Sequence, residues 1–256
     1  MKFRCCLLIA LLLPATAWSA ADPLAGEPAA AATAGDADVD DFSMFDEVDF
    51  PVVSDPLEPI NRGIFWFNDK LYFYLMKPIA RGYRHVPEPI RISVRNFFDN
   101  LKAPVRIVNA GLQGKFAGAG DELARFVTNT TLGIGGLYDP AREHFNLRPV
   151  DEDTGQTFGF YGAGPGPYLV LPILGPSNLR DGIGRIGDTR LDLSYYLWAH
   201  GKGEDNYDYL GARAVDAINT LSLDKDTYEG IKHDALDPYL FVRDGYMQYR
   251  RNLVNK

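Results

Sequence analysis

Cysteine is almost absent from the sequence, and the position of the few cysteines indicates where the protein acts. Cys5 and Cys6 lie in a short apolar run that follows two positive charges and precedes several small residues. This order is typical of a secretory signal peptide, and we expect cleavage after Ala21, with Ser19 and Ala20 as alternative sites. The mature chain is then expected to contain no disulfide, so an ordinary core has to stabilise it in an oxidising compartment.

Long apolar runs and a surplus of positive charge are also missing. No stretch after the expected signal reaches the roughly 18 uninterrupted apolar residues of a membrane-spanning helix. Residues 22–54 contain nine of the 34 acidic residues and no Lys or Arg. The remaining 25 acidic residues all lie from Asp55 onward. Of the 26 basic residues, 24 also lie there, because only Lys2 and Arg4 precede it. A nearly neutral body argues against nucleic acid as a partner.

Signatures of catalysis, metal binding and nucleotide binding are scarce as well. The chain has no G-x-S-x-G elbow and no G-K-[ST] loop, and its four histidines stand singly. We therefore expect no enzyme, no catalytic residue, no metal and no cofactor. Residues 182–187, GIGRIG, formally match a dinucleotide fingerprint, but they follow a polar turn and not a strand of a βαβ unit. We interpret these glycines as positions of close packing or sharp turns.

The sequence does contain a mainly helical pattern after an acidic tail. Residues 1–21 are the expected signal, and residues 22–54 are rich in Ala, Asp and Pro and are expected to be largely disordered. Residues 55–256 are predicted to form one helical domain. Glycines and prolines fragment residues 133–187, which predicts an irregular segment of loops and short extended pieces in the middle of that domain.

Proline positions predict where helices begin and break. Asp55-Pro56 is expected to cap the first helix, and Pro78 to end or kink it. A helix over residues 90–112 is expected to break near Pro104, and the last helix to open at Asp237-Pro238. Another helix follows the irregular segment, with an apolar stripe composed of Tyr207, Leu210, Ala214, Ile218 and Leu221.

Aromatic and apolar residues are concentrated in two segments. Residues 63–80, GIFWFNDKLYFYLMKPIA, are aromatic nearly all the way round a helix, and residues 168–174, YLVLPIL, follow the turn-forming YGAGPGP. Such a helix is either deeply buried or faces an apolar environment. Tyr and Trp favour a lipid–water boundary, and helices too short to span a bilayer can lie within one leaflet. Composition alone favours a soluble core.

Several blocks of the sequence resemble the MlaA (VacJ) family. They are DPLEPINRGIFWFND at 55–69, NLKAPVRIVNAGLQG at 100–114, RFVTNTTLGIGGLYD at 125–139 and FGFYGAGPGPYLVLPILGPSNLRDGIG at 158–184. The similarity continues through GARAVDAIN and DPYLFVRDGYMQYR, to about residue 252. The block at 158–184 is long and specific, and on it the chain is identified as a member of that family.

The resemblance implies a function and a location. It implies a helical ring seated in the cell outer membrane from the periplasmic side, beside a trimeric porin. A channel through the ring takes mislocalised phospholipids from the outer leaflet and passes them to a soluble periplasmic lipid carrier, which maintains lipid asymmetry. The alternative is a soluble periplasmic scaffold or lipid-binding module that uses the same helices as a closed core, and an extracellular enzyme is a distant third.

The resemblance also assigns roles to residues. Asn61, Phe65, Phe67 and Asn68 are expected to line the lipid channel. Arg213 is expected to face the channel and meet the lipid phosphate, with a surface or salt-bridged arginine as the alternative. The block at 158–184 is expected to be framework beside the channel. Valine at Gly164 or at Gly166 is expected to abolish transport or assembly. Arg180 and Asp181 are expected to form an ion pair that holds the end of the block. The framework residues are Tyr161, Gly162, Gly164, Gly166, Pro167, Tyr168, Pro172, Gly175, Pro176, Arg180 and Asp181.

One departure from the family pattern concerns anchoring. Family members typically carry a lipobox Cys at the mature N-terminus, whereas this sequence has no Cys after the expected signal. We therefore expect retention by apolar side chains and protein partners in place of an acyl chain. An outer-membrane pellet that resists high salt is expected for a membrane-seated channel, and a periplasmic soluble fraction for the alternative.

Overall fold

The computed structural model describes residues 54–199 and 207–256. The expected signal peptide (1–21) and, apart from its last residue, the expected acidic tail (22–54) lie outside the described residues. The described part is mainly helical, with one two-stranded sheet, which confirms the predicted fold class. Its elements are α1 (Glu58–Leu71), the π-helical turn η3 (Tyr72–Met76), α2 (Lys77–Tyr83), α3 (Glu88–Leu101), α4 (Ala103–Leu112), α5 (Phe116–Thr131), α6 (Pro140–Glu143), α7 (Thr154–Phe160), β1 (Tyr168–Leu171), β2 (Gly175–Asn178), α8 (Leu179–Leu191), α9 (Leu193–Trp198), α10 (Tyr207–Leu223), α11 (Thr227–Asp234) and α12 (Pro238–Val254).

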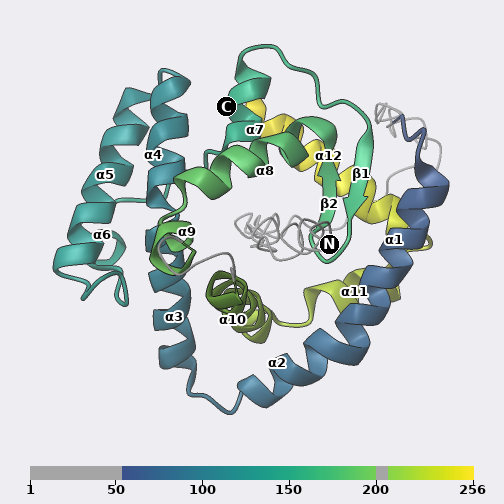
Figure 1. Cartoon of the computed structure of the whole chain (residues 1–256), viewed down its shortest axis with the longest axis horizontal. Coiled ribbons are helices and arrows are strands. Elements are labelled where there is room, and N and C mark those ends of the chain that lie inside the picture. The colour runs from purple at the N-terminus through teal and green to yellow at the C-terminus, as the bar shows by residue number, and fades with distance from the viewer. Residues whose placement is uncertain (1–53, 200–206) are drawn as a thin grey trace, which may run out of the picture.

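The elements follow one another around a ring (Figure 1). α1, η3 and α2 form one side, α3 and α4 the next, and α7, α8, the β-hairpin and α12 complete the circuit. α5 and α6 lie outside the ring beside α4, whereas α10 lies on the inner side and packs against α2 and α3. The ring closes where the side-chain amide of Asn61 donates to the Tyr168 carbonyl oxygen at 3.0 Å. Beside this contact, Arg62 Nη2 donates to Asp237 Oδ2 at 2.8 Å.

The first helix begins at Glu58, so the predicted cap at Asp55 is wrong. The Asp55 carboxylate is used between elements instead, where it accepts from Asn61 Nδ2 at 2.9 Å and contacts the Tyr239 hydroxyl. The predicted interruption at Pro78 is confirmed, because η3 separates α1 from α2, whose first turn contains the proline. A widened turn accommodates the proline ring, which would clash with the preceding turn of a regular α-helix.

Two further proline predictions are confirmed. The helix predicted over residues 90–112 is divided into α3 and α4, with Pro104 in the first turn of α4. α12 opens at Pro238, and the Asp237 carboxylate caps it by accepting from the backbone N–H of Tyr239 at 3.0 Å. Both prolines lie in a first turn, where the missing N–H has no intrahelical partner to lose.

The Gly/Pro-rich middle is more regular than the sequence predicts. Its predicted short extended pieces are present as the antiparallel pair β1–β2, but the residues that match the dinucleotide fingerprint lie inside α8. The expectation of irregular structure is therefore wrong for residues 179–187. The predicted role in close packing is confirmed, because a Cβ on Gly184 would lie 2.5 Å from the backbone N of Gly155 on α7. Two helices that touch at the backbone require glycine at the contact.

The interior of the described chain is polar. Its buried residues include 23 polar or charged ones against 15 apolar ones, while 30 large apolar residues are exposed. The apolar cluster is small and largely aromatic, and consists of Tyr168, Val170, Tyr239 and Tyr246. Buried polar groups and exposed large apolar groups are the two informative exceptions to ordinary burial, and this chain combines both. None of the helices in residues 54–199 and 207–256 is long and apolar enough to cross a membrane.

Candidate functional site

α10, the helix inside the ring, buries polar side chains and exposes apolar ones, which is the inverse of an ordinary amphipathic helix. Its buried side chains form a polar stripe at three- and four-residue steps, which consists of Tyr209, Arg213, Asp216, Asn219 and Ser222. The apolar stripe predicted for this helix lies on another face, and its members are exposed or only partly buried. α10 therefore turns polar groups toward the ring wall and apolar groups away from it.

Buried polar contacts attach α10 to the ring wall. Arg213 Nη1 contacts Asp192 Oδ2 at 3.1 Å, between α8 and α9. Asp216 Oδ2 contacts Lys102 Nζ at 3.1 Å, at the break between α3 and α4. The Asn219 side chain donates to a backbone carbonyl oxygen of α3 at 2.9 Å. Breaking a buried charge pair is costly, so these contacts fix the position of the helix.

α5 shows the same inversion on the outside of the ring. Glu122, Arg125 and Asn129 are buried, whereas Leu123 and Val127 are about half exposed. Glu122 accepts a hydrogen bond from an arginine of α4 at 2.6 Å, which holds the polar face inward. A buried polar face and an exposed apolar face on two separate helices indicate that the exposed faces meet apolar surroundings.

The exposed surface of α1 and η3 carries an aromatic pair with a cation between them. Trp66 is 62% exposed and Tyr74 is 77% exposed. Lys70 Nζ lies 6.0 Å from the centre of the Trp66 ring and 5.9 Å from the centre of the Tyr74 ring. Exposed Trp and Tyr beside a lysine are typical of a boundary between an apolar layer and water.

Two predicted channel residues, Asn61 and Asn68, hold the hairpin to α1. Asn61 donates to the backbone of β1 at 3.0 Å and accepts from it at 2.9 Å. Asn68 donates to the Leu171 carbonyl oxygen at 2.9 Å and accepts from the Ile173 N–H at 2.7 Å. Both amides are thus committed to the backbone of the framework, and their predicted contact with lipid stays a prediction.

The other two predicted residues of α1 point to different surroundings. Phe65 packs against the apolar cluster, with its ring centre 5.7 Å from that of Tyr239 in an edge-on arrangement. Phe67 is nearly half exposed, on a helix whose Trp66 is also exposed. The structure therefore does not bring the four predicted α1 residues together on one face, and their channel role stays a prediction.

Arg213 is buried and ion-paired. Its side chain is 4% exposed, and its partner Asp192 also caps α9 by accepting from the Ser194 N–H at 2.8 Å. Its Nε has no hydrogen-bond partner among the described residues. This geometry agrees with the salt-bridged alternative. For the predicted contact with phosphate, the Arg213 guanidinium has to bind the phosphate beside Asp192 or leave Asp192 for it.

The framework segment ends in a buried charge cluster. The predicted pair is present, with Arg180 Nε 3.0 Å from Asp181 Oδ1. Arg250 of α12 joins it, with Nε 2.7 Å from Asp181 Oδ2 and Nη1 2.6 Å from Asp153 Oδ2. Burial by itself raises the pKa of both aspartates, but the charge and hydrogen bonds of Arg250 hold each pKa below its ordinary value. No sequence pattern linked Asp153 to Arg250, because they are 97 positions apart.

The two central glycines of the framework differ in what they require. Gly166 has φ +67°, and a Cβ there would lie 3.0 Å from Leu179 Cβ, whereas a Cβ on Gly164 would meet open space. The carbonyl oxygens of Pro165 and Pro167 accept from the first backbone N–H groups of α8, both at 3.2 Å. The other predicted framework residues lie before β1 (Tyr161, Gly162), in β1 (Tyr168), in the hairpin turn (Pro172) and in β2 (Gly175, Pro176).

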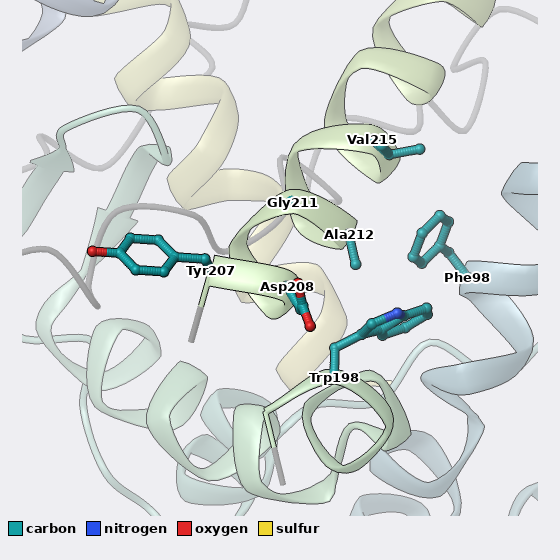
Figure 2. A pocket seen from close by; sticks show the side chains of 7 residues that line it. All are labelled: Phe98, Trp198, Tyr207, Asp208, Gly211, Ala212 and Val215. Carbon is teal, nitrogen blue, oxygen red and sulfur yellow. The ribbon is translucent and has the colours of Figure 1, made fainter. Parts of the chain in front are cut away.

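A pocket of about 500 Å³ lies between α3, α9 and α10. Figure 2 shows Ala212 and Val215 of α10 on the side that faces the rings of Phe98 and Trp198, while the Tyr207 side chain points away. The complete lining is Phe98, Trp198, Tyr207, Asp208, Gly211, Ala212 and Val215. No sequence pattern indicated this pocket, because its lining comes from three separate helices.

The glycines that match the dinucleotide fingerprint do not form a phosphate-binding turn. Within residues 54–199 and 207–256, no group of three or more His, Cys, Asp or Glu side chains could hold a metal ion. The fingerprint glycines face α7 from within a helix, and a Cβ on Gly187 would lie 3.1 Å from Thr154 Cγ2. A phosphate cradle needs free backbone N–H groups at the start of a helix, which these glycines do not supply.

The fold and the site define a class of protein, a ring of short helices with polar contacts inside and apolar side chains outside. A family model described as "MlaA lipoprotein" matches residues 53–253. The chain belongs to this MlaA lipoprotein family, as its sequence blocks predicted.

Similar proteins agree with this assignment. A Rickettsia prowazekii protein is 42% identical over 203 residues, which cover 79% of this chain and 78% of the relative. The "Intermembrane phospholipid transport system lipoprotein MlaA" of Escherichia coli and that of Shigella flexneri are each 36% identical over 207 residues, which cover 79% of both chains. A solved structure from work on the "structural basis for maintenance of bacterial outer membrane lipid asymmetry" matches with a TM-score of 0.69 and 35% identity, over 79% of this chain and 100% of that one.

Proposed function

We propose that this protein transports phospholipids between membranes. It removes mislocalised phospholipids from the outer leaflet of the outer membrane and passes them to a soluble periplasmic carrier. The names of the E. coli and S. flexneri relatives support the substrate and the process. The observation that carries the proposal is the inverted burial of α5 and α10, whose polar faces are buried while their apolar side chains are exposed or only partly buried.

The ring sits in the outer membrane from the periplasmic side without crossing it. The exposed apolar residues of α1 and η3 contact hydrocarbon, while Lys70 extends from between Trp66 and Tyr74 toward the headgroups. Backbone at membrane depth needs internal hydrogen-bond partners, and the hairpin obtains them from Asn61 and Asn68 of α1.

A lipid passes along the inner side of the ring. The face of α10 that carries Leu210 and Ile218 is turned away from the polar wall contacts and offers an apolar surface to acyl chains. Arg213 meets the lipid phosphate during passage and returns to Asp192 afterwards. A trimeric porin holds the ring in the membrane, and the soluble carrier collects the lipid on the periplasmic side. No step requires covalent chemistry.

A strain that lacks this protein tests the proposal. Phospholipid exposed on the cell surface should rise in the deletion strain and return to the wild-type level when the gene is restored. A matched control restores the gene for a variant with Arg250→Met, which removes the buried charge cluster and should not complement. An unchanged amount of surface phospholipid in the deletion strain would contradict the transport function.

Fractionation decides between this function and the alternative of a soluble periplasmic scaffold or lipid-binding module. The membrane-seated protein should remain in the outer-membrane pellet after a high-salt wash, because apolar contacts do not weaken with salt. Full release into the periplasmic fraction by osmotic shock alone would support the soluble alternative.

A further inference from the structure

The pocket between α3, α9 and α10 lies beside the helix that faces the ring interior (Figure 2). Its base is aromatic: the Phe98 and Trp198 rings are 6.0 Å apart and tilted by 32°. On α10, Gly211 and Ala212 leave room opposite these rings, and Val215 continues the apolar side. The volume of about 500 Å³ is within the range of small-molecule sites.

The pocket cannot close by a shift of α10 toward the wall. The helix is fixed by Arg213 to Asp192 at 3.1 Å and by Asp216 to Lys102 at 3.1 Å, and all four side chains are buried or nearly buried. Moving the helix separates these charges inside the protein, which is unfavourable. The apolar space is therefore a fixed property of the fold.

The lining favours a hydrocarbon chain as the ligand. A polar ligand requires several convergent donors and acceptors, but the lining side chains that converge here are mainly aromatic and aliphatic. The Tyr207 hydroxyl points away from the rings of Phe98 and Trp198, and the Asp208 carboxylate, on the Trp198 side of α10, is the charged group of the lining (Figure 2). An acyl chain needs no hydrogen bonds and gains from each methylene that it removes from water.

We propose that this pocket binds one acyl chain of a phospholipid and holds it against Trp198 while the lipid passes along α10. The proposal rests on the proposed transport function and adds a defined site to it. The aromatic rings and the small residues of α10 provide the binding surface. The headgroup stays outside the pocket.

Tryptophan fluorescence provides a direct readout. Trp18 lies in the expected signal peptide, so replacing Trp66 by Phe leaves Trp198 as the only tryptophan of the mature chain. The purified protein is titrated in mild detergent with a phospholipid that carries bromine on one acyl chain, and with the same lipid without bromine. The brominated lipid should quench Trp198 in a saturable manner, whereas the unbrominated lipid should not.

A variant that fills the pocket provides the second test. Gly211→Leu places a side chain where a Cβ meets nothing within 4 Å, so the helix can accept it. It should weaken the saturable quenching by about tenfold or more, as expected when a pocket loses the space for part of its ligand. Gly230→Leu on α11 is the matched control, because its Cβ also meets open space. It should leave the titration unchanged.

Each outcome separates the pocket from the transport function. Quenching that saturates and is lost only with Gly211→Leu supports the site. The proposed site is overturned if Trp198 is not quenched or if the two glycine variants give equal titrations. A normal level of surface phospholipid in cells with Gly211→Leu shows that transport does not need acyl-chain binding in this pocket. If the wild-type gene also fails to lower surface phospholipid in the deletion strain, the proposed function itself is wrong.

Discussion

Arg250 and Asp181 face each other inside the protein through two contacts, Nε to Oδ2 at 2.7 Å and Nη2 to Oδ1 at 3.0 Å. The same guanidinium also contacts Asp153 at 2.6 Å and 2.9 Å. One arginine of α12 therefore joins the starts of α7 and α8. This cluster fixes the end of the Gly/Pro-rich framework more firmly than the local Arg180–Asp181 pair can.

Removing this arginine is expected to destabilise the fold. Arg250→Met leaves the partly buried Asp153 without its cation and the buried Asp181 with Arg180 alone, which should lower the free energy of unfolding by about 3 kcal/mol. The neighbouring Arg251 is exposed, and Arg251→Met should change stability by less than about 0.5 kcal/mol. Chemical denaturation of both variants in detergent measures the difference. Equal midpoints for the two would contradict the structural role of Arg250.

Asp188 is expected to make stability depend on pH in the acidic range. Burial, and then the negative charge of Asp153, raise its pKa from 3.8 to about 6, against two hydrogen bonds from Thr154. The folded protein holds this proton more tightly than the unfolded chain does. The resulting stabilisation is complete below a pH of about 4 and is lost as the pH rises through about 6.

Asp188→Asn tests this dependence, because an amide oxygen can still accept both hydrogen bonds from Thr154. The variant should be more stable than the wild type at pH 7, by up to about 3 kcal/mol, and of similar stability at pH 4. Unfolding midpoints across this range provide the measurement. If the loss of stability between pH 4 and pH 7 is as large in Asp188→Asn as in the wild type, another group causes the pH dependence.

Gly164 and Gly166 are expected to respond differently to valine, although the sequence treats them alike. Gly166 has φ +67° and lies against Leu179, so Gly166→Val should cost about 2 kcal/mol or more and impair assembly. A Cβ on Gly164 meets open space, and Gly164→Val should cost less than about 1 kcal/mol. Thermal unfolding and complementation of the deletion strain measure both effects. Loss of folding in Gly164→Val alone would reverse this assignment.

Arg213 is expected to act on lipid as well as on Asp192. Arg213→Met combined with Asp192→Asn removes both charges, and an Asn still caps α9. The double variant should fold but transport about tenfold less lipid, because a charge-assisted hydrogen bond to phosphate is lost. Lys102→Met with Asp216→Asn is the control, since it neutralises the other buried pair on the same helix. If the Arg213 double variant transports lipid at the wild-type rate, Arg213 has a purely structural role.

Much of the fold follows from local sequence, and its exceptions have identifiable causes. The helix starts at Pro104 and Pro238 could be predicted, because a first-turn proline is a local signal. Asp55-Pro56 carries the same signal, but the Asp55 carboxylate bonds to Asn61 and Tyr239 in place of capping a helix. The first helix therefore begins later. Such competition between distant groups is not visible in a linear pattern.

The candidate site was less predictable than the fold. The glycines of α8 indicated broken structure, yet Gly184 is helical because it lies against Gly155 of another helix. The sequence assigned α10 an apolar stripe, but the buried stripe contains Arg213, Asp216 and Asn219. The direction of burial depends on what surrounds the helix, and periodicity alone does not distinguish an inner face from an outer one.

The central claim is that the exposed aromatic residues of α1 and η3 face hydrocarbon. Replacing Trp198 by Phe leaves Trp66 as the only tryptophan of the mature chain, because Trp18 lies in the expected signal peptide. The mature protein is then reconstituted into bilayers whose lipids carry bromine at different depths along the acyl chains. We predict that Trp66 is quenched by bromine close to the headgroups and is protected from aqueous iodide. Strong quenching by iodide together with no quenching by bromine at any depth would contradict the account.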